Sequence, residues 1–296
     1  MAVSSNAVIF EKIQDIFLVF ALLLIAYCLL LYMHPVLFQI GSLTIYTYGF
    51  CIAIGAILGF GFMAWQGKQQ FGMSFDQSNT LFIVLVLSAV IGGKVFFFFE
   101  SPLYYSKHPM ELFTGSGFVF FGSLLFCIPA MLYFFNKNKL PVWGMLDIMG
   151  MVTCIVHGFG RIGCFNAGCC YGTPTESSLA VIFTDEKSQA PINVSLHPVQ
   201  LYESALIFLL FGSLWLLKRR KQFDGQLFLI YLMTYSAGRS IIEVFRGDEA
   251  RGYIIQSWLS HSQFIALIVI AISGFVYLQL RRKAKLVSGL KSKSKP

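Results

Sequence analysis

Long apolar stretches with few charges recur along this chain and constrain its fold more than any other feature. A helix needs about 20 mostly apolar residues to cross about 30 Å of bilayer hydrocarbon. Seven windows meet this requirement: Ile16–Met33, Ile45–Trp65, Thr80–Phe99, Phe118–Phe135, Val199–Leu217, Gln226–Ile242 and Gln263–Leu280. They predict an all-α, polytopic integral membrane protein.

An eighth window, Val142–Phe165, is weaker because it contains Asp147, His157 and Arg161. We interpret it as a helix that faces a polar interior, so the sequence predicts seven to eight transmembrane helices. Composition agrees: 56% of residues are hydrophobic and 12% are charged. Soluble domains are about 25% charged, so this chain lacks the polar surface of a water-exposed globule.

The first window could also be a cleaved signal peptide. Glu11, Lys12 and Asp15 give it no positive N-terminal region, and no clear Ala-x-Ala cleavage site follows Met33. These features favour an uncleaved helix.

The net charge of +8 could suggest a nucleic-acid partner, but the placement of the basic residues argues otherwise. When loops are assigned to alternating sides of the predicted helices, fifteen of the 22 Lys and Arg residues fall on one side and four on the other. The basic side is expected to be cytoplasmic. Both termini are then inside, and the polar connections 100–117 and 167–198 are outside, where 167–198 is expected to fold as a small external cap.

Ionisable residues within predicted spans are costly, about 2.5–3.5 kcal/mol each on insertion scales, and are therefore functional candidates. Most of these residues sit at the outer ends of their helices, and Lys94 is an exception that lies deeper. The full set is Lys94, Glu100, Asp147, His157, Arg161, Glu203, Arg239 and Glu243. The alternative is that they pair and hold helices together; Arg239 and Glu243, four residues apart, can pair locally. Arg161, Arg239 and Arg246 would suit a phosphate, in a membrane most simply a phospholipid headgroup.

Two segments near the predicted outer face carry further candidates. The first, Gly158–Gly172, is rich in glycine, which permits close helix packing or close approach of the backbone to a ligand. The second, Leu196–Ser204, opens a predicted helix: Pro198 suits its first turn, His197 lies just outside, and Gln200 and Glu203 share one face.

Three of the seven cysteines, Cys164, Cys169 and Cys170, cluster at the predicted outer face. A disulfide is plausible if that compartment is oxidising. A bridge between neighbouring residues is strained, so Cys164 with one of the other two is the favoured pair. Zinc binding with His157 or His197 is disfavoured because the spacing matches no zinc ribbon or finger. No metal and no cofactor are predicted.

Several short motifs follow one another between residues 34 and 280: Pro35–Gly41, Tyr48-Gly49, Gly92-Gly93-Lys94, Gly160-Arg161-Ile162-Gly163, His197–Glu203 and Arg239–Arg246. In their order and spacing, the chain resembles the bacterial phosphatidylglycerol–prolipoprotein diacylglyceryl transferases. This resemblance implies a transferase-like membrane domain at 34–280, an extra N-terminal transmembrane segment at 1–33 and a basic cytoplasmic tail at 281–296.

The resemblance implies a reaction at the outer leaflet of the bacterial inner membrane, in which a diacylglyceryl group passes from phosphatidylglycerol to a cysteine thiol of a lipoprotein precursor. Arg161, Arg239, Glu243, His197 and Tyr48 are the expected catalytic residues. The expected substrate-binding residues are Arg161, Arg239, Arg246, Lys94, Gly172, Gln200 and Glu203.

This chain also departs from the family pattern. Phe121 stands where the family usually has histidine, Cys164 where it has asparagine, Cys169 where it has glutamate, and Lys94 where it has arginine. The general base must therefore lie elsewhere. His197 and Glu243 are equal candidates, with Glu203 behind them. Two alternative functions remain open: a non-catalytic phospholipid-binding or transport protein, and a membrane thiol–disulfide protein that uses the three clustered cysteines.

Overall fold

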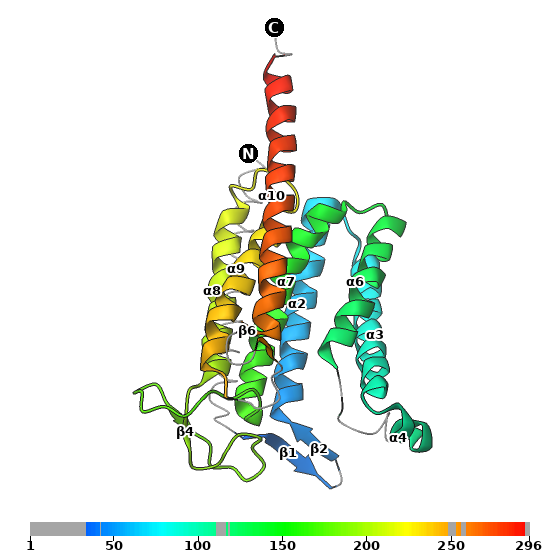
Figure 1. The fold of residues 1–296 in the computed structure, drawn as a ribbon. Coiled ribbons are helices and arrows are strands. Elements are labelled where there is room, and N and C mark those ends of the chain that lie inside the picture. The colour runs from blue at the N-terminus through cyan, green and yellow to red at the C-terminus, as the bar shows by residue number, and fades with distance from the viewer. Residues whose placement is uncertain are drawn as a thin grey trace, which may run out of the picture. The chain divides into compact units, whose positions relative to one another are not determined.

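Seven helices of the computed structural model are long and apolar enough to span a membrane. The structure describes residues 34–41, 43–110, 117, 119–247, 253–255 and 259–293, so the predicted span Ile16–Met33 lies outside the described residues. The seven helices are α2 (Thr47–Phe71), α3 (Phe75–Glu100), α6 (Phe120–Lys137), α7 (Val142–Ala167), α8 (Val199–Lys218), α9 (Gln226–Ile242) and α10 (His261–Lys293) (Figure 1). The prediction of an all-α polytopic membrane protein is confirmed.

The chain divides into two compact units. The first combines Met1–Gly59 with Gly150–Pro296, and the second is Phe60–Met149. Helices α2 and α7 each contribute one part to both units.

In the second unit, α3 and α6 pack closely at a pair of glycines. A Cβ atom added to Gly92 would lie 2.4 Å from the carbonyl oxygen of Gly122, and the converse distance is also 2.4 Å. Only glycine permits this approach of the two backbones. Helix α3 begins with a capping box in which Ser74 and Gln77 satisfy each other's backbone N–H groups.

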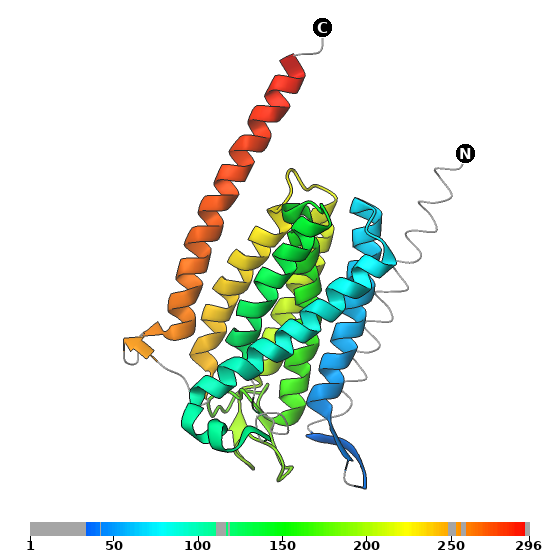
Figure 2. The same ribbon diagram turned by 90° about the vertical axis from the view of Figure 1, so that its right-hand side faces the viewer.

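In the first unit, α7 is the most enclosed of the seven spans, with 67% of its apolar window buried. Gly55 of α2 lies against α7, where an added Cβ would come within 2.9 Å of the Phe159 Cβ. Helices α8, α9 and α10 stand next to one another (Figure 1), and α10 is a single long helix (Figure 2). Because α10 continues to Lys293, the predicted basic tail at 281–296 begins as helix.

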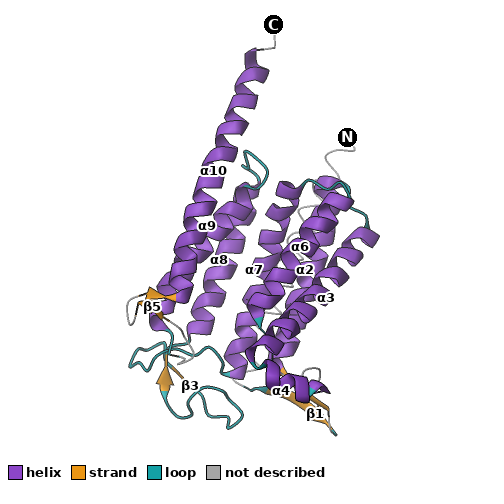
Figure 3. Ribbon diagram, turned by 45° about the vertical axis from the view of Figure 1, so that its right-hand side comes forward, coloured by secondary structure: helices purple, strands orange, loops and turns teal. Residues whose placement is uncertain are grey.

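Short antiparallel strand pairs accompany the helices (Figure 3). Strands β1 (Val36–Ile40) and β2 (Leu43–Tyr46) form a hairpin directly before α2. The sequence analysis placed Ile45 in the first turn of a helix instead, because an apolar strand that runs into an apolar helix leaves no break in hydropathy. A further pair, β5 (Tyr253–Ile255) and β6 (Leu259–Ser260), precedes α10.

The segment between α7 and α8 is folded. Strands β3 (Val181–Ile182) and β4 (Ser195–Leu196) pair within it. A small apolar core of Phe165, Phe183, Ala190 and Leu196 holds it together. This segment lies at the end of the first unit where α7 ends and α8 begins, and the site described next is at that end (Figure 3).

Candidate functional site

The buried carboxylate of Glu203 on α8 contacts polar side chains of the neighbouring helices α7 and α9. Its side chain is 1% exposed. The Arg161 Nε lies 3.1 Å from Glu203 Oε2, and the Arg239 Nε lies 3.8 Å from Oε1. The hydroxyl of Tyr235 donates a hydrogen bond of 2.8 Å to Oε1. Glu203 therefore links α7, α8 and α9 in one ionic network.

Helical spacing explains why these residues meet. His157 and Arg161 are four residues apart on α7, and Tyr235 and Arg239 are four apart on α9, so each pair lies on one helix face. The Arg161 Nε donates a hydrogen bond of 3.2 Å to His157 Nε2, which also lies 3.5 Å from Glu203 Oε1. In this contact His157 Nε2 is the acceptor nitrogen of the imidazole.

A second buried carboxylate, Glu243, extends the network from the end of α9. It is 4% exposed and forms an ion pair with Arg239, as the spacing of four residues predicts. The Ser262 hydroxyl donates a hydrogen bond of 2.8 Å to its Oε1. Arg161 and Arg239 thus face Glu203 and Glu243, two positive charges against two negative ones. Ion pairs this enclosed are costly to break, about 3–5 kcal/mol when one partner is removed.

His197, Gly172 and Arg246 meet at a backbone junction beside this network. The His197 amide donates to the Thr173 carbonyl at 3.0 Å, and the Gly172 amide donates to the His197 carbonyl at 3.2 Å. An isolated bridge joins Gly172 to Arg246. A Cβ on Gly172 would lie 2.4 Å from the His197 carbonyl oxygen, so only glycine fits there. The His197 Nδ1 lies 3.3 Å from the Tyr202 hydroxyl, and its ring contacts Phe245.

Gln200 lies on the same buried face of α8 as Glu203. Its amide nitrogen donates a hydrogen bond of 2.8 Å to the Cys169 carbonyl. Its amide oxygen is buried and has no hydrogen-bond partner among the described residues. Tyr48, the second residue of α2, is 42% exposed, and its backbone lies against Gly163 of α7.

The three clustered cysteines converge where α7 ends. The sulfur atoms of Cys164, Cys169 and Cys170 lie within 4.8 Å of one another, and all three are free thiols in the structure. Hydrogen bonds with Cys164 and Cys169, reinforced by the charges of Arg161 and Arg246, hold the pKa of Cys170 below its ordinary value. The corresponding hydrogen bonds and burial raise the pKa of Cys169. The disulfide expected from the sequence stays a prediction.

Two other predicted positions belong to the second unit. The Lys94 Nζ lies 5.8 Å from the centroid of the Phe97 ring. Phe121, which by resemblance stands where the family usually has histidine, is 60% exposed on α6.

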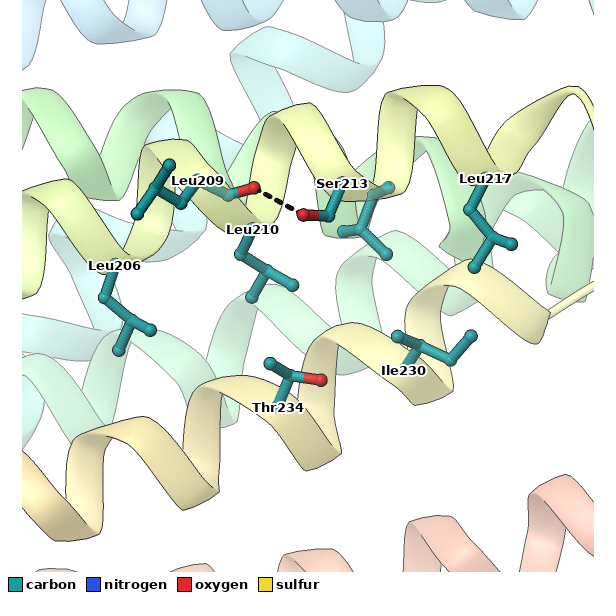
Figure 4. Close-up of a pocket in the computed structure, with 8 residues that line it drawn as sticks. Leu206, Leu209, Leu210, Ser213, Leu217, Ile230 and Thr234 are labelled. Atoms are coloured by element: carbon teal, nitrogen blue, oxygen red, sulfur yellow. Dashed lines mark hydrogen bonds between the residues drawn. The ribbon is translucent and has the colours of Figure 1, made fainter.

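An apolar groove lies between α8 and α9 (Figure 4). It is lined by Leu206, Leu209, Leu210, Ser213, Leu214, Leu217, Ile230 and Thr234. The Ser213 hydroxyl donates to the Leu209 carbonyl at 2.8 Å, so its hydrogen bond is made within its own helix. Leu206 follows Glu203 by three residues, and Thr234 precedes Tyr235, so one end of the groove adjoins the ionic network.

The sequence analysis missed two residues of the network. Tyr235 precedes Arg239 by one helical turn, and this spacing could have revealed it. Ser262 carries no such signal, because only the packing of α10 against α9 brings it to Glu243.

Comparisons with known proteins place the chain beside one family of membrane transferases. The model of a family described as prolipoprotein diacylglyceryl transferase matches residues 35–279. A phosphatidylglycerol–prolipoprotein diacylglyceryl transferase of Clostridium tetani is 38% identical over 83% of this chain and 97% of its own length. A relative from Clostridium perfringens, named transferase 2, is 34% identical over 84% and 96%. One from Dehalococcoides mccartyi is 31% identical over 85% and 95%.

Proposed function

The chain belongs to the prolipoprotein diacylglyceryl transferase family, and we propose that it transfers a diacylglyceryl group from phosphatidylglycerol to the cysteine thiol of lipoprotein precursors. One observation carries the proposal beyond the family match. Arg161 and Arg239 both lie against the buried carboxylate of Glu203, and Arg246 is held at the adjacent junction. This arrangement concentrates guanidinium groups at one end of a membrane-spanning bundle, where a phospholipid headgroup would enter.

The reaction requires the glycerol phosphate part of the donor lipid to leave. The thiolate attacks the glyceryl carbon, a C–S bond forms, and the C–O bond to the phosphate breaks with its electrons. Glycerol phosphate departs, and the thiol proton passes to a base. Positively charged donors that are already fixed in place stabilise the charge that develops on the phosphate oxygens. Arg161 contacts Glu203 and His157 through Nε, so the terminal nitrogens of its guanidinium can contact phosphate.

The contacts of the candidate bases separate their roles. Glu203 and Glu243 are each held by arginine and by a hydroxyl donor, which suits carboxylates that position the arginines. His197 uses Nδ1 toward Tyr202, and its Nε2 would accept the thiol proton. Gln200, whose amide oxygen is an acceptor, would bind a glycerol hydroxyl of the donor lipid.

The apolar groove supports a lipid substrate. It runs from the ionic network along α8 and α9, within their membrane-spanning lengths. An acyl chain in this groove would keep its headgroup at the arginines. Burial of each CH₂ is worth about 0.8 kcal/mol, so even a partly seated chain contributes to binding.

The orientation of the charges supports a reaction at the outer leaflet. The network lies where α7 ends and α8 begins. The basic loop Lys218–Asp224 and the basic end of α10 lie at the other end of these helices, which is the cytoplasmic end by the positive-inside rule. Both termini are then cytoplasmic, in a multi-pass protein of the bacterial inner membrane.

Thioether formation on a cysteine-containing precursor peptide tests the proposal. We expect purified protein in phosphatidylglycerol micelles to add the mass of a diacylglyceryl group to the peptide and to release glycerol phosphate. Phosphatidylethanolamine should not replace the donor. Failure to modify the peptide would contradict the proposed activity, and equal use of both lipids would contradict the proposed donor.

The second candidate is a non-catalytic phospholipid-binding or transport protein, which the replacement of the family's histidine by Phe121 favours. This candidate predicts that phosphatidylglycerol binds and that no thioether forms. Lipid retention on the purified protein, measured beside peptide modification, therefore separates the two functions.

A further inference from the structure

Three thiols that share no role in the proposed reaction meet at one point of the fold. Cys164 belongs to the last turns of α7, and Cys169 and Cys170 follow the end of that helix. Their sulfur atoms lie within 4.8 Å of one another. Two sulfurs bound to one ion at about 2.3 Å each can be at most about 4.6 Å apart. The three sulfurs are therefore already close to the spacing of a single coordination shell.

The backbone is shaped for this convergence. Gly168 has a φ of +74° and ends α7 in the left-handed region, as a glycine commonly does after a helix. Cys170 has a φ of +58°, which is rare for a residue with a side chain. The two turns bring the neighbouring side chains of Cys169 and Cys170 back toward Cys164.

We propose that Cys164, Cys169 and Cys170 form a trithiolate site for one thiophilic d¹⁰ metal ion of the class of Zn²⁺ and Cu(I). Thiolates select these soft or borderline-soft ions over Mg²⁺ or Ca²⁺. A disulfide would use two of the sulfurs and leave the third without a role, whereas a metal ion uses all three. Three ligands complete a trigonal Cu(I) site, and with Zn²⁺ they leave a fourth position for water.

The surrounding charge suits an anionic metal–thiolate centre. Three thiols that bind an ion release three protons, and three thiolates with Zn²⁺ or Cu(I) carry a net charge of −1 or −2. Arg161 and Arg246 both act on Cys170 electrostatically and would offset this charge.

The site would fix the end of α7 to the start of α8. Gln200 of α8 donates its hydrogen bond to the carbonyl of Cys169, and Gln200 lies one turn before Glu203. Arg161 lies one turn before Cys164. A bound ion would therefore hold in register the two helix ends that carry the Arg161–Glu203 ion pair.

Metal binding to the full-length reduced protein in detergent tests this inference. Anaerobic protein is incubated with Zn²⁺ or with Cu(I), desalted, and analysed for metal per chain. We expect about one ion per chain in the wild type and in Cys127→Ser, a control whose thiol bonds to the Leu85 carbonyl in the other unit. Cys164→Ser, Cys169→Ser and Cys170→Ser should each weaken binding at least about 10-fold, since even second-shell changes cost 10- to 100-fold. Uptake of Zn²⁺ alone or Cu(I) alone identifies the ion.

A second measurement needs no variant and so does not depend on the folding of a mutant. The wild type is alkylated with and without metal, and the modified cysteines are identified by mass spectrometry. Bound metal should protect Cys164, Cys169 and Cys170 together, and a chelator should restore all three. Unchanged metal uptake in the three serine variants would overturn the inference. So would a disulfide within the triad that persists in the metal-free protein without reductant.

Discussion

The Arg161 Nε lies 3.1 Å from the Oε2 of Glu203, and this ion pair joins α7 to α8 where the candidate site is built. Glu203 also receives Arg239 and the Tyr235 hydroxyl from α9. One carboxylate therefore sets the position of both arginines that we assign to the phosphate. Its side chain is buried, so water cannot replace it as the partner of the two arginines if its negative charge is removed.

Glu203→Gln should destabilise the protein and abolish transfer. The substitution leaves Arg161 and Arg239 without their shared counter-ion, and such a loss in a buried pair costs about 3–5 kcal/mol. Thermal unfolding in detergent measures the effect. The control is Asp224→Asn, which removes a solvent-exposed ion pair with Lys221 and should cost under about 1 kcal/mol. Equal melting of Glu203→Gln and wild type would show that the network does not hold the helices.

Arg161→Lys should lower the transfer rate about 100-fold, the usual loss when one fixed donor to a developing negative charge is removed. Lysine keeps the charge and loses the planar fork that binds two phosphate oxygens. The rate of thioether formation is compared with that of Arg220→Lys, a matched change in the loop at the other end of α8. Full activity of Arg161→Lys would show that the guanidinium of Arg161 is not needed to bind the phosphate.

His197→Gln should lower the transfer rate by about 10²- to 10⁴-fold if His197 is the general base. Binding of phosphatidylglycerol by His197→Gln should be unchanged, because His197 is proposed to act on the thiol proton and not on the lipid. His108→Gln, outside the network, is the control. Glu243→Gln should instead weaken lipid binding through Arg239 and keep most of the transfer rate at saturating phosphatidylglycerol. If the two variants exchange these behaviours, Glu243 is the base.

Reporter fusions test the orientation of the chain. A fusion at Pro191, between α7 and α8, should report the outer compartment, and a fusion at Gly289, near the end of α10, should report the cytoplasm. The expectation rests on the fifteen basic residues assigned to one side against four on the other. The same result at both sites would show that the predicted number of crossings is wrong.

Metal-free, reduced protein should show Cys170 as the most readily alkylated of the three clustered thiols. Hydrogen bonds from its two neighbours and the charges of Arg161 and Arg246 lower its pKa, so its thiolate persists as the pH falls below about 8.5, the ordinary thiol value. Cys169, whose pKa is raised, should react more slowly than Cys170. The rates are read from mass spectra of iodoacetamide-treated protein at several pH values. A Cys170 rate that drops as steeply with pH as that of glutathione would contradict the assignment.

The sequence by itself determined the membrane-spanning helices. The length of an apolar run is a local property of the chain, and the thickness of the bilayer sets the length that a spanning helix needs. Helix α9 has the bounds predicted from its apolar window, Gln226–Ile242, and α8 ends one residue beyond the prediction. The local pairing of Arg239 with Glu243 also followed from helical spacing. In contrast, the hairpin of β1 and β2 was missed, since its pairing continues without a break into an apolar helix.

Only the tertiary structure decided which helix faces meet. Periodicity places Arg161 on one face of α7 and Glu203 on one face of α8, but it does not state that those faces turn toward each other. The rotation and depth of each helix follow from contacts between segments far apart in the chain, such as Gly55 against Phe159. For that reason Glu203, ranked behind Glu243 as a base from the sequence, lies at the centre of the network. The meeting of three sulfurs likewise depends on two left-handed turns at Gly168 and Cys170. A glycine commonly adopts this conformation after a helix, but a residue with a side chain rarely does, so the turn at Cys170 had no signal in the sequence.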